Sequence, residues 1–357
     1  MNIFFLICPI GFEPLLLQEL TYKWPLHFPE ESFRIVSNEN GGIEIETSLN
    51  HGLQLNRILK IPTRILLRLK NQKCRDLPKL FNIMKKINWK QYLKQQNIDF
   101  HISAKKSRLI HTGRIRKTAN DALLAYFNAN KLPGKLEIKN AEDQVIHLRF
   151  NEDNLDISLD TSGELLHKRD KNSYRGKASI RESFSAALCL KLLGLKSYSD
   201  HTFIDPMCGS GTNLFEARDF FTLNNRDFSY HNWTGVNESS LKDLPNIWNL
   251  VSLVGNELDE SVYENIKGEG LDIRLGDFFN FTFDSPSFLI LNPPYGKRIK
   301  IDQDKVKYFR SLIKHIKANI KPKKFGIIIP RDFASQIESK ERLNFNQNGI
   351  KVSFLIF

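Results

Sequence analysis

The spacing of apolar and polar positions divides the chain into two parts with different patterns. In the first part, short apolar runs and amphipathic stretches alternate irregularly, which is typical of α+β units. A polar stretch with several charges, residues 161–172, follows, and we place the main boundary there. The strands expected before this boundary are 2–7, 33–36, 43–47, 99–104, 136–139, 145–151 and 154–160, and the expected helices are 12–20, 77–93 and 118–130.

Beyond residue 160 the pattern becomes regular, because apolar strands alternate with amphipathic helices. This order favours a parallel sheet covered by helices. The chain contains no internal sequence repeat and no low-complexity tract. The second part is therefore expected to form one α/β unit.

A glycine-rich turn joins the first apolar strand of the second part, residues 201–205, to a helix. Gly209 and Gly211 would let the backbone approach a ligand closely, and Asp205 at the strand end could accept hydrogen bonds from a cationic amine. A glycine pair alone also fits a tight turn without a ligand, and the phosphate-binding pattern GxxxxGK is absent. We interpret the turn as a candidate site for a nucleotide-type cofactor.

Two further carboxylates stand at the ends of later strands. Glu257 lies where an acidic side chain would hold a ribose diol, and Asp277 would suit an adenine amino group. The 46 residues between Gly211 and Glu257 exceed the roughly 20 of a plain dinucleotide fold, which predicts an insertion over 223–249. Each carboxylate alone is more often a solvated strand end, but the series that begins with Asp205 indicates a nucleoside site.

The sharpest signal is Asn-Pro-Pro-Tyr at residues 292–295, which ends the apolar run 288–291. The prolines fix the backbone, so the carbonyl of Pro293 has no neighbouring amide with which to pair. With the side-chain oxygen of Asn292 it offers two acceptors for one planar NH2 group, and Tyr295 offers a stacking face. These acceptors would polarise and orient an exocyclic base amine. A rigid Pro-Pro turn without a chemical role is the alternative.

Composition and charge indicate a partner. Apolar residues make up 41% and charged residues 26%, which excludes collagen-like, disordered and membrane-embedded classes, and the net charge is +12. Between Arg57 and Lys117 there are 18 basic residues and only two acidic ones. Because apolar and aromatic residues interleave this stretch, we expect a folded basic surface that binds nucleic-acid phosphates. A solvated, lysine-rich helix face is the alternative.

The first residues and the cysteines indicate the compartment. Residues 1–12 are apolar but contain Cys8, Pro9 and Gly11 and lack a basic leader, so neither a signal peptide nor a membrane span is expected. The four cysteines form no CxxC pair and have no clustered histidines. We therefore expect a cytoplasmic protein without a metal site.

The whole chain resembles one family of enzymes. Asn292 to Tyr295 is similar to the hallmark of Rossmann-like S-adenosylmethionine-dependent methyltransferases that act on exocyclic amines. More narrowly, the chain resembles the THUMP-domain RNA methyltransferases, and most of all the bacterial 23S rRNA guanine-N2 methyltransferases of the UPF0020 type. The residues that carry this resemblance are Cys8 to Gly11, Ser107 to Gly113, Leu166, His167, Ile180 to Glu182, Asp205 to Thr212, Phe228, Trp233 and Asn292 to Gly296.

The resemblance implies a fold and a domain order. We expect an α/β protein whose Rossmann-like class I methyltransferase sheet is mostly parallel, with an antiparallel last strand. Residues 1–60 would form a ferredoxin-like α+β unit, residues 61–160 a THUMP RNA-binding domain, and residues 161–357 the methyltransferase domain. One methyltransferase domain implies a single activity.

The resemblance also assigns roles. S-adenosyl-L-methionine would be the cofactor and rRNA the partner, with no metal, membrane or stable protein partner implied, and the methyl group would move by direct in-line displacement. The implied catalytic residues are Asn292, Pro293, Pro294 and Tyr295. The implied cofactor-binding residues are Asp205, Met207, Gly209, Gly211, Thr212, Glu257, Asp277 and Asn292. The implied RNA-binding residues are Lys105, Lys106, Arg108, Arg114, Arg116 and Lys117.

One departure and three rival functions accompany this interpretation. The family often has Arg-Gly-Tyr-Arg where this chain reads Arg-Asp-Lys-Asn at 169–172, so the resemblance assigns no RNA or cofactor contact to that loop. We interpret His111 and His167 as structural or RNA-contacting, and Cys208 as a small packed side chain. The rivals are a tRNA guanine-N2 methyltransferase, a DNA adenine-N6 methyltransferase and a non-catalytic RNA-binding assembly factor.

Overall fold

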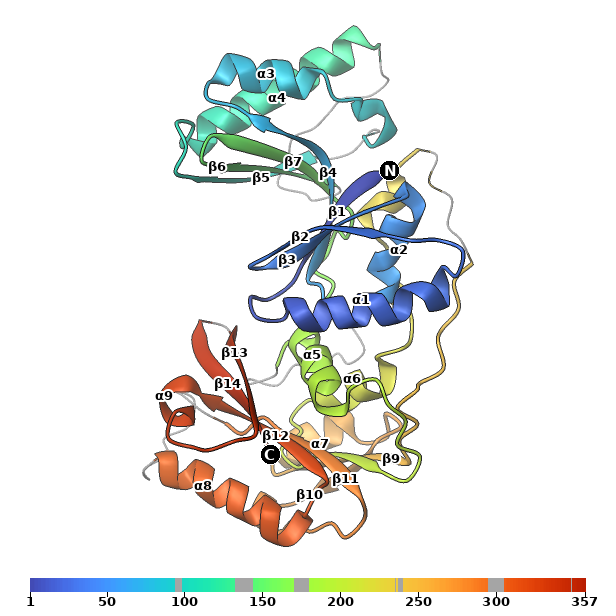
Figure 1. The fold of residues 1–357 in the computed structure, drawn as a ribbon, viewed down its shortest axis with the longest axis vertical. Helices are drawn as coiled ribbons and strands as arrows, with labels where there is room; N and C mark the ends of the chain where they lie inside the picture. The colour runs from blue at the N-terminus through green and yellow to red at the C-terminus, as the bar shows by residue number, and fades with distance from the viewer. Residues whose placement is uncertain are drawn as a thin grey trace.

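The computed structural model describes residues 1–93, 98–131, 144–169, 180–234, 236, 240–294, 305–347 and 349–357. This part of the chain forms two halves, each built around a seven-stranded sheet (Figure 1). The N-terminal half is at the top of Figure 1 and the C-terminal half at the bottom, and helices α1 (Glu13–His27) and α5 (Glu182–Leu193) pack together where the halves meet.

The N-terminal sheet has the strand order β2-β3-β1-β4-β7-β6-β5. Only β5 and β6 run parallel; the other neighbouring strands are antiparallel. The long strand β4 pairs with β1 on one side and β7 on the other, so the sheet is continuous across the domain limit expected at residue 60. The strands are β1 (Asn2–Ile7), β2 (Arg34–Glu39), β3 (Gly42–Thr47), β4 (Arg64–Lys73), β5 (Ile98–Lys105), β6 (Gln144–Asn151) and β7 (Asn154–Asp160).

The far end of this sheet has an apolar side and a polar side. Along β6, the buried Ile146, Leu148 and Phe150 alternate with the more exposed His147 and Arg149, as the two-residue period of a strand requires. Helices α3 (Leu77–Lys85) and α4 (Thr112–Ala129) pack together, and α4 contacts β5. In Figure 1 these helices lie above β5, β6 and β7, on the side away from the C-terminal half.

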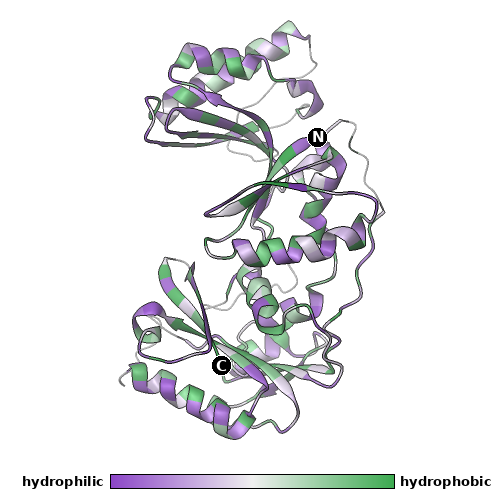
Figure 2. Ribbon diagram, in the orientation of Figure 1, coloured by the Kyte–Doolittle hydropathy of each residue, from purple (hydrophilic) through white to green (hydrophobic). Residues whose placement is uncertain are grey.

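The C-terminal sheet has the strand order β10-β9-β8-β11-β12-β14-β13. The first five strands in this order are parallel, and β14 runs antiparallel to both β12 and β13, which confirms the expected fold class. Green, apolar residues follow these strands in Figure 2, and the strands at the centre are buried on both faces. The strands are β8 (Thr202–Asp205), β9 (Ser252–Glu257), β10 (Asp272–Leu275), β11 (Ser287–Leu291), β12 (Lys324–Pro330), β13 (Glu341–Gln347) and β14 (Ile350–Ile356).

The described part of the C-terminal half also contains the α-helices α6 (Thr212–Asp219), α7 (Glu260–Ile266), α8 (Lys305–His315) and α9 (Arg331–Ala334). No helix in the described ranges is long and apolar enough to cross a membrane. The same ranges contain no cluster of three or more side chains suited to hold a metal ion. All four cysteines are buried and free.

An aromatic cluster joins the halves beside the Cys8 to Gly11 segment. The ring of Phe12 lies 5.2 Å from those of Phe184 on α5 and Phe345 on β13, between ring centroids. Gly11 has a positive φ of 94°, and a Cβ atom there would come within 2.9 Å of the Asn344 carbonyl oxygen. This segment therefore needs glycine because the backbones approach closely at the contact between the halves.

Several elements differ from the sequence predictions. Helix α1 continues to His27, α4 begins at Thr112 instead of residue 118, and the helix expected over 77–93 ends at Lys85 and is followed by a 3-10 turn, Trp89–Gln91. Strand β4 and helix α2 (Leu49–Ile58) were not predicted, because their apolar residues show no clean period in the sequence. The strand expected at 136–139 lies outside the described residues.

Candidate functional site

A cavity of about 850 Å³ opens at the carboxyl ends of β8, β9, β10 and β11. It exists where it does because parallel strands end at the same edge of the sheet, and each contributes the loop that follows it. The sequence-predicted residues in its wall are Asp205, Met207, Gly209, Thr212, Glu257, Asp277, Asn292 and Pro294. Gly211 and Pro293 adjoin the wall without lining it, and Tyr295 lies outside the described residues.

The glycine-rich turn adopts a conformation that explains its composition. Gly209 and Gly211 have φ values of 53° and 74°, in the left-handed region that side chains other than glycine rarely adopt. Gly211 is the residue before α6, and its amide donates to the Cys208 carbonyl over 2.9 Å. The turn thus holds its backbone against the cavity and directs the start of α6 towards it.

Glu257 connects two loops of the cavity. One of its carboxylate oxygens accepts a hydrogen bond from the Gly209 amide at 2.9 Å, and the other accepts from the amides of Leu258 and Asp259, each at 2.9 Å. A carboxylate has about four acceptor positions, so roughly one remains for a ligand. Glu257 can therefore hold a hydroxyl group while it fixes the turn after β8 to the loop after β9.

Asp205 is almost fully buried at the end of β8. Burial raises the pKa of its carboxyl to about 7, although hydrogen bonds from the Asn213 side chain at 2.8 Å and the Met207 amide at 3.3 Å oppose the rise. A cation placed against this carboxyl would stabilise its ionised form. The group is therefore suited to bind an amine and to lose its proton when it does so.

Two large apolar side chains of the cavity lining are exposed. The exposed fraction is 47% for Phe279 and 67% for Leu258, so both face solvent. Asp277 accepts a hydrogen bond from the Phe279 amide at 2.7 Å, which fixes the turn that carries this ring. A flat ring with a polar edge would cover both apolar side chains and reach Asp277.

Asn292 offers a free acceptor at the inner wall. Its side-chain oxygen is buried and has no hydrogen-bond partner among the described residues. An unsatisfied buried oxygen costs about 1–3 kcal/mol, so its retention here favours a role in binding a donor. Pro293 and Pro294 follow it directly and remove two backbone donors from this wall.

Sequence reasoning missed several residues of the wall. The side-chain amide of Asn256 donates to the carbonyls of Pro206 and Gly276, at 3.3 and 2.9 Å, and so links the loops after β8 and β10. In the sequence, only its position next to Glu257 could have indicated that Asn256 belongs to the cavity wall. Ile180 and Tyr308 also line the cavity, but Tyr308 lies on α8, and no motif marks it.

The expected RNA-binding residues lie on the N-terminal half, apart from this cavity (Figure 1). Lys105, Lys106 and Arg108 surround the turn after β5, and Arg114 and Lys117 are exposed near the start of α4. Arg116 pairs with the Asp99 carboxylate and donates to the Phe100 carbonyl at 2.6 Å. Lys106 and Arg108 also form ion pairs, with Glu152 at 3.4 Å and Asp153 at 4.0 Å, but both cations stay largely exposed. Lys105, Arg114 and Lys117 are exposed without an ion pair among the described residues, so they are the most available to a polyanion.

Three other residues noted in the sequence analysis are held by packing, hydrogen bonds or an ion pair. Trp233 of the inserted segment donates to the Gln144 side chain at 2.7 Å and packs on Tyr92. Cys208 is buried, and burial raises the pKa of its thiol. Both observations agree with the interpretation of Cys208 as a small packed side chain. Arg169 forms a buried ion pair with Glu216; the rest of the departure from the family, residues 170–172, lies outside the described residues.

The sequence matches a known family and known proteins. Residues 169–344 match the profile of the RMKL-like methyltransferase domain, UPF0020. The chain is 26% identical to the ribosomal RNA large subunit methyltransferase K/L of Colwellia psychrerythraea, over 75% of this chain and 41% of the relative. For the protein of the same name from Marinomonas, the values are 25%, 91% and 48%. The chain thus spans about half the length of these curated relatives.

Two solved structures share the fold over the full chain. One, described as a possible methylase from Clostridium difficile, has a TM-score of 0.81 at 23% identity and covers 100% of this chain and 97% of its own. The other, SMU.472, described as a putative methyltransferase complexed with SAH, has a TM-score of 0.80 at 19% identity with the same coverage. The arrangement of both halves therefore recurs in proteins of very different sequence.

Proposed function

We propose that the protein methylates an exocyclic base amine in RNA, namely guanine N2 of large-subunit rRNA; the premise is that residues 169–344 match the RMKL-like methyltransferase domain, UPF0020. The observation that carries the proposal is the buried side-chain oxygen of Asn292, which has no hydrogen-bond partner among the described residues, in a cavity that also presents Asp205, Glu257 and Asp277. An rRNA substrate would place the activity in the cytoplasm.

The cavity fits S-adenosyl-L-methionine, the methyl donor of this domain class. Asp205 would hold the amine of the methionine portion, Glu257 a ribose hydroxyl and Asp277 the adenine amino group, with Phe279 and Leu258 against the ring. The open backbone of the glycine turn allows close approach. When bound, the cofactor supplies an electrophilic methyl group on a sulfonium.

Asn292 would orient the base amine that receives the methyl group. Its side-chain oxygen and the Pro293 carbonyl would accept the two N–H groups, which fixes the amine plane and directs its lone pair towards the methyl donor. The methylated amine carries a positive charge and releases its proton readily, so no dedicated base is required. The target base must leave its stack to reach this wall.

RNA is favoured as the substrate by the basic N-terminal half and by the names of the two curated relatives, both ribosomal RNA methyltransferases. The exposed cations Lys105, Lys106, Arg108, Arg114 and Lys117 would contact phosphates, which positions an RNA without reading its sequence. Guanine N2 and adenine N6 both fit a pair of acceptors, so the choice of guanine rests on the family resemblance, and the choice of large-subunit rRNA rests also on the names of the two relatives.

The test is a labelling experiment with three substrates. The full chain is incubated with isotopically labelled S-adenosylmethionine and with unmodified rRNA, tRNA or DNA, and the nucleosides are identified by mass. We expect N2-methylguanosine from rRNA. N2-methylguanosine from tRNA alone would move the substrate to tRNA, and N6-methyladenine from DNA would favour the DNA rival. No labelled nucleoside despite measured cofactor binding would favour an assembly factor.

Asp205 predicts a pH dependence of cofactor affinity. Its pKa of about 7 means that most of the free protein carries a neutral carboxyl at pH 6, whereas an amine binds the ionised form. Binding below pH 7 must release this proton, so the Kd of S-adenosylhomocysteine should be about tenfold higher at pH 6 than at pH 8. Calorimetry at both values measures it. An Asp205→Asn variant should bind weakly with a flat profile; an equally steep profile in that variant would contradict the assignment.

A further inference from the structure

A buried hydrogen-bonded bridge connects the Asp205 carboxyl to helix α5 behind the wall of the C-terminal cavity. The side-chain amide of Asn213 donates to one carboxylate oxygen of Asp205 at 2.8 Å, and the side-chain oxygen of Asn213 accepts from the Ser185 hydroxyl at 2.7 Å. Asn213 lies in the first turn of α6 and Ser185 in the first turn of α5, and these helices lie side by side (Figure 1). We call these three side chains the Asn213 bridge.

The Asn213 bridge is withdrawn from solvent. The exposed fraction is 2% for Asn213, 0% for Ser185 and 1% for Asp205. Burying an amide and a hydroxyl requires that their hydrogen bonds be satisfied, whereas apolar residues of the same shape would pack there at little or no cost. Packing of α5 against α6 therefore does not by itself explain two polar residues at this position.

The Ser185 hydroxyl fixes which end of the Asn213 amide faces Asp205. A hydroxyl has a single proton to donate, and the Asn213 side-chain oxygen at 2.7 Å is closer to it than the Thr212 carbonyl at 3.4 Å. With its oxygen engaged there, the amide presents its NH2 group to Asp205. An NH2 group donates but does not accept, so it stabilises the ionised carboxylate over the neutral acid.

The other groups around Asp205 oppose this effect or are neutral. Burial raises the pKa of Asp205, and the Glu257 carboxylate on β9 raises it further. The thiols of Cys208 in the glycine turn and Cys189 on α5 also interact electrostatically with Asp205, but both stay neutral because burial raises their own pKa. Glu216 on α6, which also acts on Cys189, is held in a buried ion pair. Hydrogen bonds must therefore supply what favours the ionised carboxylate.

We propose that Asn213 and Ser185 are positioning residues of the cofactor site, which keep the Asp205 carboxylate ionised and oriented for the amine of the methionine portion. This inference rests on the proposed function, in which Asp205 holds that amine. The Met207 amide also donates to Asp205, but at 3.3 Å it forms the longer and weaker hydrogen bond. Asn213 thus supplies the larger share of the stabilisation, and its effect reaches the cofactor through Asp205.

The first test is the pH dependence of S-adenosylhomocysteine affinity in the full-length Asn213→Leu variant, measured by calorimetry. Leucine has nearly the same size but no amide, so the pKa of Asp205 should rise by about one unit. More protein must then lose a proton to bind, so the Kd should be about fivefold above that of the wild type at pH 7 but within about twofold at pH 8.5. Equal weakening at both pH values would show a packing role and overturn the proposal.

Proton release gives a second measurement. Calorimetry at pH 7 in buffers of different ionisation enthalpy counts the protons lost on binding. With an Asp205 pKa of about 7, the wild type should release about 0.5 proton per ligand and Asn213→Leu about 0.9. Ser185→Ala retains Asn213 but frees its amide to turn, so it should give an intermediate value and a Kd raised about twofold. The same proton release in the wild type and in Asn213→Leu would contradict the role of the bridge.

The controls separate this effect from damage to the site. 5′-Methylthioadenosine shares the adenosine part of the cofactor but has no amine, so its affinity should be the same in the wild type and in Asn213→Leu. Asn265→Leu makes the same replacement at an exposed asparagine of α7 and should leave the pH profile unchanged. In an Asp205→Asn background, Asn213→Leu should have no further effect, because the carboxyl on which it acts is absent. A further loss in that background would overturn the assignment.

The Asn213 bridge and the proposed function can fail separately. A steep pH profile in the wild type with the same profile in Asn213→Leu would overturn the role of the bridge and leave the proposed function standing. A flat profile in the wild type would overturn both the amine site at Asp205 and the bridge. Absence of RNA methylation, with both pH profiles as expected, would overturn the proposed substrate and support the bridge.

Discussion

Asn292→Ala is expected to lower the rate of methyl transfer to RNA by about 100- to 1,000-fold, with RNA affinity unchanged. Its side-chain oxygen is the one buried acceptor at the inner wall that has no hydrogen-bond partner within the described part of the chain. Removing a preorganised polar partner of the reacting group typically costs a factor of this size, because the group must then be oriented by solvent. Single-turnover methylation with labelled cofactor measures the rate.

Two further variants sharpen this test. Asn292→Asp retains an acceptor oxygen at the same position, so it should lose less activity than the alanine variant. Asn346→Ala removes an exposed side chain of β13 and should leave the rate unchanged. A loss of cofactor affinity that accounts for the whole fall in rate would contradict the role in orienting the amine, as would full activity of Asn292→Ala.

That the predicted cofactor-binding residues share one cavity was largely predictable from the sequence, because they follow strands of a parallel sheet. Asp205, Glu257 and Asp277 are far apart in the chain, but each ends a strand or closely follows one, and parallel strands bring such positions to one edge. The structure places all three in one wall. What the sequence did not reveal is that Glu257 also holds the Gly209 turn in place.

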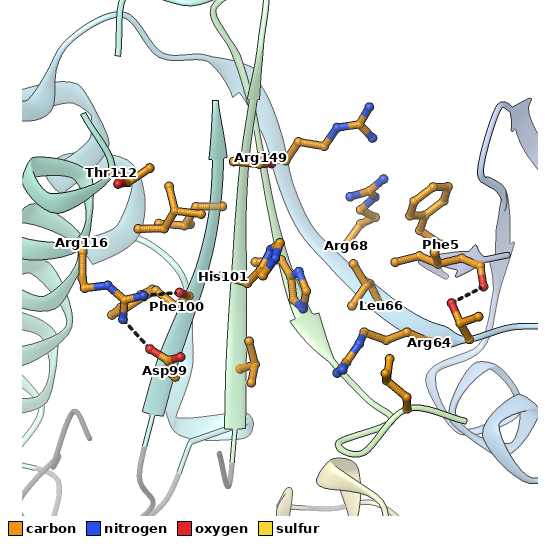
Figure 3. A pocket seen from close by; sticks show the side chains of 18 of the residues that line it. Phe5, Arg64, Leu66, Arg68, Asp99, Phe100, His101, Thr112, Arg116 and Arg149 are labelled. Carbon is orange, nitrogen blue, oxygen red and sulfur yellow. Dashed lines mark hydrogen bonds and ion pairs between the residues drawn. The ribbon is translucent and has the colours of Figure 1, made fainter. Parts of the chain in front are cut away.

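The cavity of about 830 Å³ beside strands β1, β4, β5 and β6 (Figure 3), in contrast, was not predictable. It depends on the parallel register that sets His101 opposite His147 and on the long strand β4, which places Arg68 in the same row. Nothing in the local pattern fixes which strands are neighbours, and a one-residue shift of register would move each side chain to the other face. Tyr308 was missed for a similar reason, since its place in the cavity wall follows from the packing of α8.

A buried polar network connects the two halves and gives them a fixed relation. Lys23 on α1 is fully buried, pairs with Glu19 at 2.7 Å, and donates to the carbonyls of Ile58 and Phe220 at 3.1 and 2.6 Å. Phe220 directly follows α6, whose first residue lines the cofactor cavity. The helix beside the glycine turn is thus held by a residue of the N-terminal half, so this half and the wall of the C-terminal cavity share a support.

Glu19→Ala should therefore lower the free energy of unfolding by about 3–5 kcal/mol. Glu19 is fully buried, and its carboxylate accepts hydrogen bonds from Lys23 and from the amides of Lys60 and Ile61, at 2.7, 2.7 and 3.0 Å. Its removal leaves a buried ammonium and two amides without their acceptor, which is the costly way to break a buried ion pair. Urea unfolding followed by fluorescence measures the change.

The control for this variant is Glu30→Ala, which removes an exposed carboxylate just beyond α1 and should change the unfolding free energy by less than about 0.5 kcal/mol. Where Glu19→Ala remains folded, methylation of RNA should fall more than S-adenosylhomocysteine binding, because the support between the halves is loosened while the wall of the cofactor cavity is intact. A loss of stability below about 1 kcal/mol would show that the network is not what holds the halves together. An equal fall in methylation and in cofactor binding would show instead that its effect reaches the cavity itself through α6.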